Sequence, residues 1–420
     1  MVLSTKWGCL VISKCIMAKL LQINAALNKG STGRIAEQIA SLARSRGWET
    51  YMIHGARYVN RSDMHTLQSV TPIGEKVHAV KSMLFDAHGL GSTGATRKVI
   101  REINHIGPDI IHLHNIHGYY LNYKVLFEYL RSIDVPVVWT LHDCWAMTGH
   151  CAWFDSINCE RWKTGCYSCP LKGEYPKTLL LDRSKRNYML KKGLFASLGN
   201  MTIVPVSQWL EDIVHESILK GYPCHVINNG IDISVFSPLK SDLRLELGFG
   251  DKMILLGVAS IWEERKGLQD FIKLAEKLPD TYRIILIGVS DNQRDSLPDN
   301  IIGVTRTDSQ KELAEYYSMA DVFVNPTYSD NFPTTNLEAL ACGTPVITYR
   351  TGGSPESVAP ETGLIVDKGD FEGLVAAIEE IGKKGKSHYS AACRERAEAL
   401  YNKDDRYEDY IKLYESLLQR

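Results

Sequence analysis

The sequence of 420 residues has no long apolar run, no internal repeat and no low-complexity tract. No stretch reaches the roughly 18 uninterrupted apolar residues that a membrane-spanning helix needs. Residues 1–16 hold an apolar run of about five residues, which is shorter than a signal-peptide core of ~7–15. With 44% apolar and 23% charged residues, the composition excludes disordered, collagen-like and coiled-coil chains. We therefore expect a cytoplasmic globular protein of two or three domains.

A better first strand follows Met17, where the sequence continues Lys19-Leu-Leu-Gln-Ile. We therefore interpret residues 1–16 as an N-terminal extension and Met17 as the natural start.

The chain as a whole also lacks an excess of one charge sign, because 48 Lys+Arg stand against 49 Asp+Glu, a formal net charge of −1. Taken alone, this total argues against a nucleic-acid or membrane partner. Residues 1–200, however, carry 25 basic and 14 acidic side chains (+11), and residues 201–420 carry 23 and 35 (−12). Such opposite halves indicate two domains with different roles, and the basic half suits an anionic or membrane-bound partner. The alternative is that the charges segregated without a function.

Apolar runs alternate with segments of helical periodicity in two successive rounds. In the first half we expect parallel strands at 20–25, 50–54, 109–113, 136–141 and 202–206, with helices at 33–46, 97–106, 122–132 and 184–198. In the second half we expect strands at 252–259, 283–289, 301–304, 321–325, 345–348 and 364–366, with helices at 267–277, 309–319, 335–341 and 371–382 and a helical tail at 389–419. This pattern predicts an α/β chain of two doubly wound, Rossmann-like domains, which bind ligands at the carboxyl ends of their strands.

Three groups of residues in the first half are candidates for a site. A loop with Gly30 and Gly33 follows the first strand and opens a helix, which suits phosphate binding but equally a plain tight turn. His114, Asn115 and His117 follow the third strand and favour the lining of a polar substrate site over a metal site. The next strand ends in His142-Asp143, which indicates an active site, the alternative being a helix cap by Asp143.

Ten cysteines are present, and five of them lie between residues 144 and 169. Four have the spacing C-x7-C-x6-C-x2-C, which suits a tetrahedral structural zinc: Cys151, Cys159, Cys166 and Cys169. The segment is short and rich in turns, so a bound metal would stabilise it. Disulfides in an oxidising compartment and free buried thiols are the alternatives.

The second half holds the strongest motif. Arg265 and Lys266 stand at a strand-to-helix turn, where two cations can neutralise a diphosphate or can simply be solvated. Asp330 and Glu338 lie eight positions apart around the start of a helix, and carboxylates accept hydrogen bonds from sugar hydroxyls. The loop between them can hold phosphate at the helix start.

With these motifs the chain, from about Lys19 to its end, resembles a retaining glycosyltransferase of family 4 with the GT-B architecture. Further markers are Asn229-Gly230-Ile-Asp232, Ala320-Asp-Val-Phe-Val-Asn-Pro326 and Gly343-Thr-Pro345. The stretch from Leu141 to Cys151, with the later cysteines, is similar to colanic-acid and capsule-type glycosyltransferases. The resemblance implies an acceptor-binding domain at 17–224 with a Cys-rich insertion at 144–170, a nucleotide-sugar domain at 225–395, and a helix at 396–420 that returns to the first domain.

The resemblance also assigns roles to residues. It implies that Glu338 binds the ribose, Lys266 the diphosphate, and that His142 and Asp143 lie beside the reacting sugar. The donor would further contact Gly30, Gly33, Arg265, Arg306, Thr307, Asp330, Asn331, Phe332, Pro333, Thr334 and Thr335. Two departures from the family pattern stand out. Ser260 replaces an arginine, which puts Arg265 forward as the missing cation, and the first carboxylate is Asp330 instead of glutamate, which leaves the donor sugar open.

We thus predict a retaining transferase that moves a sugar from a UDP- or GDP-linked donor to a glycan or lipid-linked glycan in bacterial surface polysaccharide biosynthesis. No cofactor is expected for catalysis and no nucleic-acid partner. The +11 half fits a peripheral contact with an anionic membrane, at the inner face of which such acceptors are found. Alternative functions are a sugar-nucleotide epimerase or phosphorylase of the same architecture, or a non-catalytic sugar-nucleotide-binding protein.

Overall fold

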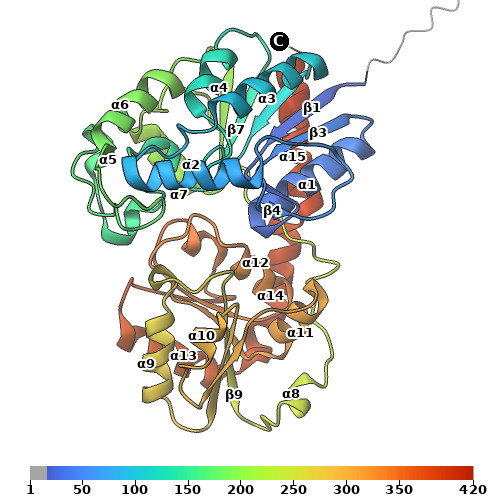
Figure 1. Cartoon of the computed structure of the whole chain (residues 1–420). Helices are drawn as coiled ribbons and strands as arrows, with labels where there is room; N and C mark the ends of the chain where they lie inside the picture. The colour runs from blue at the N-terminus through green and yellow to red at the C-terminus, as the bar shows by residue number, and fades with distance from the viewer. Residues whose placement is uncertain (1–16, 420) are drawn as a thin grey trace, which may run out of the picture.

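The computed structural model describes residues 17–419, so the expectation about residues 1–16 lies outside the described part of the chain. Figure 1 shows two α/β lobes, one above the other, each built around its own twisted sheet. Both sheets contain six strands, and all of their strand pairs are parallel. The predicted fold class, two doubly wound Rossmann-like domains, is therefore confirmed.

The first sheet has the order β5-β3-β1-β6-β7-β8. Its strands are β1 (Lys19–Ile23), β3 (Glu49–His54), β5 (His65–Gln68), β6 (Ile110–Leu113), β7 (Val137–Leu141) and β8 (Met201–Pro205), and a short pair joins β2 (Ala26–Leu27) to β4 (Tyr58–Val59). Five of the six were expected from apolar runs. β5 was missed because it is an edge strand that is mostly exposed, so its residues His-Thr-Leu-Gln need not be apolar.

Helices of the first domain are α1 (Gly30–Ser45), α2 (Pro72–Phe85), α3 (Thr93–Ile106), α4 (Tyr123–Leu130), α5 (Arg161–Thr164), α6 (Ser184–Phe195) and α7 (Gln208–Glu216), with 3-10 turns η1 (Trp145–Met147) and η2 (Phe154–Ile157). The helices α2, α5 and α7 were not predicted, and among them α2 has an unusual pattern of burial. Its buried residues are Glu75, His78 and Ser82, whereas the apolar Ile73, Val77, Val80 and Phe85 are exposed, so it does not show the usual pattern of an apolar face toward the core.

The second sheet has the order β11-β10-β9-β12-β13-β14. Its strands are β9 (Met253–Val258), β10 (Tyr282–Ile287), β11 (Ile301–Val304), β12 (Val322–Asn325), β13 (Val346–Tyr349) and β14 (Gly363–Val366). Helices are α8 (Leu243–Glu246), α9 (Leu268–Lys277), α10 (Asp291–Arg294), α11 (Gln310–Met319), α12 (Thr334–Ala341) and α13 (Phe371–Lys384), with turns η3 (Glu264–Lys266) and η4 (Ser354–Ser357). The strand order changes direction between β9 and β12, which is the switch point where such sheets bind ligands.

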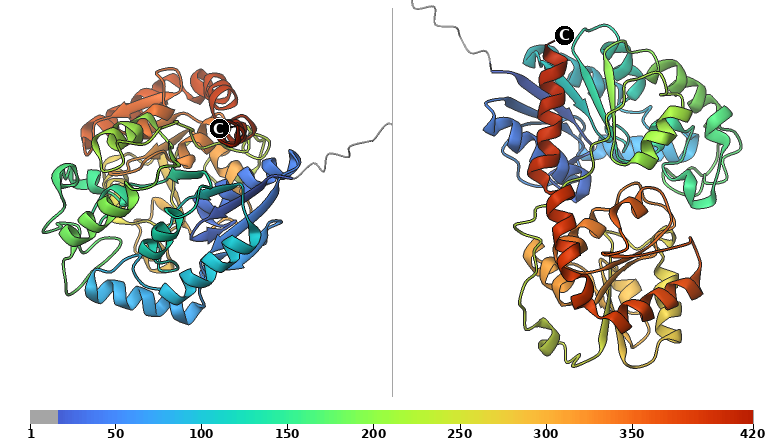
Figure 2. Two further views of the ribbon diagram at one scale, coloured as in Figure 1. Left: turned by 90° about the horizontal axis from the view of Figure 1, so that it is seen from above. Right: turned by 180° about the vertical axis from the view of Figure 1, so that it is seen from behind.

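The helical tail consists of two helices, α14 (Lys386–Tyr401) and α15 (Lys403–Leu418), which meet at Asn402. The Asn402 side chain accepts a hydrogen bond from the N–H of Asp404 at 3.2 Å and so caps α15. From there α15 runs back along the first domain and packs against α1 (Figure 2, right). Its buried Tyr407, Tyr410 and Tyr414 join a hydrophobic cluster with residues of β1 and α1. The expected return of the C-terminal helix is therefore confirmed.

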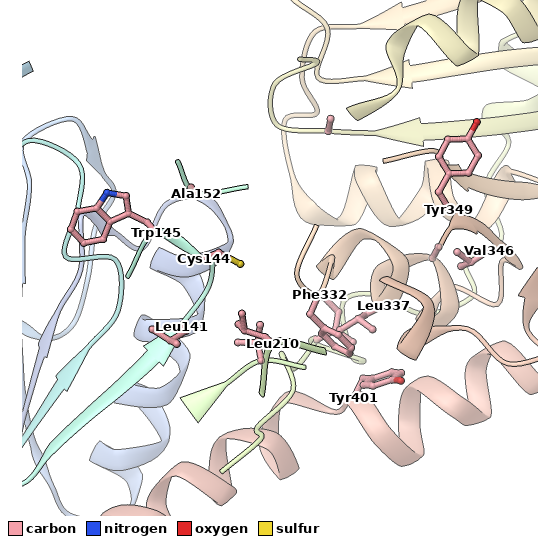
Figure 3. Packing of buried hydrophobic residues seen from close by; sticks show 14 of the residues in the cluster. Leu141, Cys144, Trp145, Ala152, Leu210, Phe332, Leu337, Val346, Tyr349 and Tyr401 are labelled. Carbon is pink, nitrogen blue, oxygen red and sulfur yellow. The ribbon is translucent and has the colours of Figure 1, made fainter. Parts of the chain in front are cut away.

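Buried side chains also connect the two domains. One hydrophobic cluster includes Leu141 and Leu210 from the first domain and Phe332 and Leu337 from the second, as Figure 3 shows. The chain passes between the domains after α7, where a parallel bridge pairs Cys224 with Ile203 and a second one pairs Ile231 with Asn402. We propose the domain boundary between these two bridges, near residues 224 and 225.

Candidate active site

The turn before α9 brings Lys266 to the loop that follows β12. Gly267 has φ +78°, and a Cβ there would lie 2.3 Å from the carbonyl oxygen of Pro326, so only glycine fits without strain. The N–H of Tyr328 donates to the carbonyl of Arg265 at 2.7 Å, which fastens the two segments together. As a result Lys266 Nζ lies 2.5 Å from Asp330 Oδ2, in an ion pair whose side chains are about one-fifth exposed.

Glu338 lies on α12 and is buried. Its Oε2 accepts a hydrogen bond from the Tyr317 hydroxyl at 2.8 Å. Burial raises the pKa of Glu338 to about 7, although the Tyr317 hydrogen bond and the charge of Arg34 act in the opposite direction. Arg34 belongs to α1 of the first domain, so the start of α1 faces α12 across the junction between the domains. Neither Tyr317 nor Arg34 was singled out in the sequence, since only the tertiary structure places them near Glu338.

The loop of residues 331–335 lies in the second domain and contacts the first domain through Asn331. The Asn331 side chain donates to the backbone carbonyl of His142 at 2.8 Å, and Asn229 donates to the carbonyl of Phe332 at 3.0 Å. The ring of Phe332 is buried in the core, so this residue would contact a donor through its backbone, as the resemblance implies. Pro333 precedes Thr334 and Thr335, the first residues of α12, and gives the helix no side-chain cap. The N–H groups at this helix start therefore suit an anion.

A small pocket lined largely by polar side chains lies at the carboxyl ends of β6 and β7. Its lining includes all five residues that we expected at these strand ends: His114, Asn115, His117, His142 and Asp143. His114 Nδ1 lies 3.1 Å from His142 Nε2, and His117 Nε2 lies 2.8 Å from Asp143 Oδ2. Asp143 Oδ1 also accepts from the N–H of Trp145 at 2.8 Å, so it caps the next turn as well as facing the pocket.

Gln22 in β1 fixes the tautomers of the two linked histidines. Its Nε2 donates to the carbonyl of Ala36 at 2.8 Å, so its Oε1 accepts from His114 Nε2 at 2.8 Å. His114 Nδ1 must then accept, and His142 Nε2 carries the proton between the two rings. The Nδ1 of His142 is left unprotonated. Sequence reasoning missed Gln22, although a polar side chain within the fully buried run of β1 was a signal.

Burial sets the charge of this pocket. It lowers the pKa of His142 to about 4, with Asp143 opposing the shift, and lowers the pKa of His114 well below its usual value. Burial would raise the pKa of Asp143, but the charge and the hydrogen bond of His117 and the N–H of Trp145 outweigh it, so the pKa is lowered. Near neutral pH the pocket therefore holds two neutral imidazoles beside an ionised carboxylate, a set of hydrogen-bonding groups suited to sugar hydroxyls.

The remaining donor candidates surround the same junction. Gly30 and Gly33 open α1, and a Cβ on Gly33 would lie 3.2 Å from the backbone nitrogen of Asn28, so the loop is tightly packed there. Arg306 and Thr307 follow β11 on the carboxyl side of the second sheet. The Arg265 side chain is held in place by two contacts. Its guanidinium lies 4.0 Å from the centre of the Trp153 ring and donates to the carbonyl of Ser329 at 3.3 Å.

The Cys-rich insertion reaches across to the second domain near these residues. Lys368 donates to the carbonyl of Asp155 at 2.8 Å and to the Asn158 side chain at 2.9 Å. The hydroxyl of Ser329 donates to the carboxylate of Asp155. Together with Trp153 against Arg265, these contacts place the insertion over the edge of the loop that carries Asp330.

The four cysteines of the insertion line one small pocket. The N–H of Gly149 donates to Cys166 Sγ at 3.1 Å. All four are free thiols. Within residues 17–419, however, the one group of three or more potential ligand atoms within 4.8 Å of one another lies elsewhere, at Glu211, His215 and Cys224. The insertion thus gathers the thiols at one place without the close packing of a preformed tetrahedral site.

Comparison with known proteins gives two family matches. Residues 32–235 match "Glycosyltransferase Family 4", and residues 252–384 match "Glycosyl transferases group 1". Over 414 residues the chain is 26% identical to WcaC of Escherichia coli (strain K12), whose name describes a colanic acid biosynthesis glycosyl transferase; the match covers 95% of this chain and 100% of the relative. A 186-residue match, 31% identical, joins 41% of the chain to 42% of a D-inositol 3-phosphate glycosyltransferase of Mycobacteroides abscessus.

Solved structures of low sequence identity share the fold. Sucrose-phosphate synthase from Thermosynechococcus elongatus has a TM-score of 0.73 at 20% identity, covering 96% of this chain and 99% of that one. Anabaena HepE in complex with UDP and glucose has a TM-score of 0.66 at 15% identity, covering 95% and 100%. These likenesses establish the GT-B architecture.

Proposed function

The chain is a glycosyltransferase of the family 4 type with GT-B architecture, and from this premise we propose that it transfers a sugar from a nucleoside-diphosphate sugar to a glycan or lipid-linked glycan acceptor. The single observation that carries the proposal is the hydrogen bond from Asn331 to the carbonyl of His142. It joins the loop of the carboxylates Asp330 and Glu338 to the polar pocket of the first domain. A donor on one side and an acceptor on the other would thus meet at His142.

The proposed donor site lies in the second domain. Glu338 accepts hydrogen bonds from the ribose, while Lys266 and the N–H groups at the start of α12 meet the negative charge of the diphosphate. Gly30 and Gly33 approach the phosphates from the first domain, and Arg306 and Thr307 lie toward the base. We favour UDP over GDP as the nucleotide of the donor, because the similar Anabaena HepE has been solved in complex with UDP and with UDP-glucose.

The proposed chemistry retains the configuration of the anomeric carbon. As the bond to the diphosphate breaks, Lys266 and the helix start stabilise the leaving group, and the acceptor hydroxyl attacks on the same face and gives its proton to the leaving phosphate. The unprotonated Nδ1 of His142 and the carboxylate of Asp143 hold hydroxyls of the sugars in place. The positive charge of Lys266 and of the helix start would let the reaction proceed without a catalytic metal or another cofactor.

The acceptor side and the pathway are proposals too. His114, Asn115 and His117 would line the acceptor site, and the full-length similarity to a protein named for colanic acid biosynthesis favours bacterial surface polysaccharide, including capsule, as the product. No helix within residues 17–419 has the length and apolarity to cross a membrane. We place the protein in the cytoplasm, with the basic first half in peripheral contact with an anionic membrane at its inner face.

A structural zinc in the insertion is a further part of the proposal. Support comes from the shared pocket of Cys151, Cys159, Cys166 and Cys169 and from the Gly149 N–H, which donates to Cys166 Sγ. Binding would draw the four sulfurs together and fix the insertion, which carries Trp153 and Asp155 against the second domain.

The decisive experiment is a panel of nucleotide sugars, read by release of nucleoside diphosphate with and without an extract of lipid-linked acceptors. We expect release that depends on the acceptor and a product whose anomeric configuration, seen by NMR, matches that of the donor. Conversion of the donor to an epimer without acceptor would instead indicate an epimerase. Donor binding with neither hydrolysis nor transfer would indicate a non-catalytic binding protein.

A further inference from the structure

The helix α2 has its apolar and polar faces exchanged relative to a normal surface helix. Ile73, Val77 and Val80 point outward with exposed fractions of 75%, 62% and 50%, whereas Glu75 and His78 are buried. A soluble surface helix buries the apolar face instead. The outward row follows the helical spacing of three and four residues, so it forms one continuous stripe.

Specific bonds hold α2 in this orientation. The Glu75 carboxylate accepts from the N–H of Ala56 at 2.9 Å and pairs with Arg57 at 3.1 Å. His78 Nε2 accepts from the N–H of Gly91 at 2.9 Å. Rotating the helix to bury its apolar row would break all three contacts and leave buried polar groups unpaired. The apolar row is therefore held outward by the fold itself.

A second apolar segment lies beside the end of α2. Leu179, Leu180 and Leu181 are exposed by 54%, 67% and 40%. The N–H of Leu179 donates to the carbonyl of Met83 at 2.7 Å, which fixes the segment against the helix. We call the combined surface the α2 face; it consists of Ile73, Val77, Val80, Phe85, Leu179, Leu180 and Leu181. These are seven of the 17 large apolar side chains that are exposed in the described part of the chain.

The α2 face is bordered by positive charge. Exposed cations on or beside it are Lys76, Lys81, Lys177, Lys185 and Arg186, and the guanidinium of Arg183 lies 6.0 Å from the centre of the Phe85 ring. Of the two acidic residues in the same segments, Glu75 is buried, and Asp182 accepts from the N–H groups of Cys169 and Ser184. A second copy of this chain would bring like charges together, whereas anionic lipid headgroups would neutralise them.

We propose that the α2 face is the membrane-binding surface of the protein, with its apolar side chains inserted among the acyl chains and its lysines at the headgroups of an anionic leaflet. An apolar stripe flanked by lysines is the usual composition of helices that lie in the plane of a membrane interface. Figure 2 (left) shows α2 at the outer margin of the first domain, where a planar surface can reach it. The inference deepens the proposed peripheral contact and does not depend on sugar transfer.

The α2 face is also linked to the proposed acceptor pocket. Asp86, directly after α2, accepts from His150 Nδ1 at 2.6 Å and from the N–H of Arg183 at 2.6 Å. Two residues further on, the ring of His88 packs 5.7 Å from that of His117, which lines the pocket. These contacts connect the end of α2 to the lining of the pocket through buried side chains.

The test is flotation of the full chain, without nucleotide sugar or acceptor, with vesicles of phosphatidylcholine alone or mixed with phosphatidylglycerol. We expect binding to the mixed vesicles that weakens with salt. A triple variant, Ile73→Ser/Val77→Ser/Val80→Ser, should have a partition coefficient into the mixed vesicles that is about tenfold lower than that of the wild type. The matched control Leu245→Ser/Leu400→Ser, at exposed apolar positions elsewhere, should bind like the wild type. Lys76→Gln/Lys81→Gln should reduce both binding and its salt dependence, whereas Lys240→Gln/Lys311→Gln should not.

Equal binding by the triple serine variant and the wild type would overturn the proposal, as would a lack of binding to mixed vesicles. A wild-type dimer in sedimentation velocity that the serine variant converts to a monomer would also overturn it, since the face would then be a self-interface. Thermal unfolding checks the fold of each variant, and Val77→Ser alone serves if the triple variant is unfolded. Because no sugar donor is present, failure here is distinct from failure of the proposed transfer reaction.

Discussion

The Lys266 ammonium and the Asp330 carboxylate lie 2.5 Å apart, so the two residues assigned to the donor neutralise each other in the free protein. A donor diphosphate that binds Lys266 must share or replace this partner. Asp330 thereby has two roles in the proposal: it orients Lys266 before the donor arrives, and it is free to accept a sugar hydroxyl afterwards. Separate substitutions of the two residues can distinguish these roles.

Lys266→Ala should lower kcat by about 10²–10³, because it removes positive charge from the place where the leaving group becomes negative. Asp330→Asn should instead let UDP bind more tightly, since Lys266 loses its competing partner, while transfer becomes slower. Steady-state kinetics and UDP titration measure the two effects. Lys240→Ala, at an exposed lysine of the second domain, is the control, and near-normal turnover by Lys266→Ala would reject its role.

The pKa of Glu338, raised to about 7, predicts that donor binding depends on pH. Ribose hydroxyls donate to the carboxylate and favour its ionised form, so nucleotide affinity should fall as the pH drops below 7, by up to about tenfold per pH unit. In the unliganded protein the stability of the fold has the opposite pH dependence to nucleotide affinity. The stability that comes from the neutral, buried acid is complete below the unfolded pKa of 4.5 and is lost as the pH rises through about 7.

Glu338→Gln should remove both pH dependences and abolish most transfer. Calorimetric titration of UDP in buffers of different ionisation enthalpy measures the proton released on binding. An unchanged pH profile in the glutamine variant would show that another group titrates.

Gly267→Ala should destabilise the protein and remove activity together. Its φ of +78° costs an alanine about 1–3 kcal/mol, and the added Cβ would press on the carbonyl of Pro326. The displaced turn would carry Lys266 away from Asp330. The matched control is Gly173→Ala, a glycine whose Cβ would meet nothing within 4 Å. Chemical denaturation gives the stabilities, and equal stability of the two variants would contradict the strain argument.

Tyr414→Phe should loosen the returning helix α15. The Tyr414 hydroxyl lies 2.7 Å from Nδ1 of the buried His112, so its removal leaves one ring nitrogen unpaired, at a cost of about 1–3 kcal/mol in the free energy of unfolding. Tyr58→Phe, at an exposed tyrosine, is the control and should be neutral. Urea denaturation measures both. A Tyr414→Phe variant as stable as the wild type would mean that water replaces the hydroxyl.

The zinc proposal predicts about one metal ion per chain in protein purified without chelator. Cys169→Ser should lower the metal content and the stability of the insertion. Cys224→Ser is an informative control, because Cys224 belongs to the other group of potential ligands, with Glu211 and His215. If the Cys224 variant alone loses its metal, the site is on α7 and the insertion contains free thiols. Less than a tenth of an equivalent of zinc in the wild type would remove the proposal.

The sequence was most informative at the ends of buried strands. The residues expected after β6 and β7 do line one pocket, because side chains at the carboxyl ends of adjacent parallel strands share an edge of the sheet. The sequence was least informative where polar side chains are buried or apolar side chains are exposed. The helix α2 and the edge strand β5 were missed because neither presents an apolar face to the core, and Gln22 was passed over because its run was otherwise apolar.

The sequence by itself determined the buried parallel strands of both domains, most of the helices between them, and the places where the motifs stand on them. These properties follow from local periodicity, since a strand or helix buries residues at a spacing that its own geometry sets. Only the tertiary structure decided which groups meet, such as Lys266 with Asp330, Gln22 with His114, and Tyr317 with Glu338, and only it set the outward orientation of α2. Each of these depends on contacts between segments far apart in the chain, and in the buried sites on the low polarity of the surroundings, which no local pattern contains.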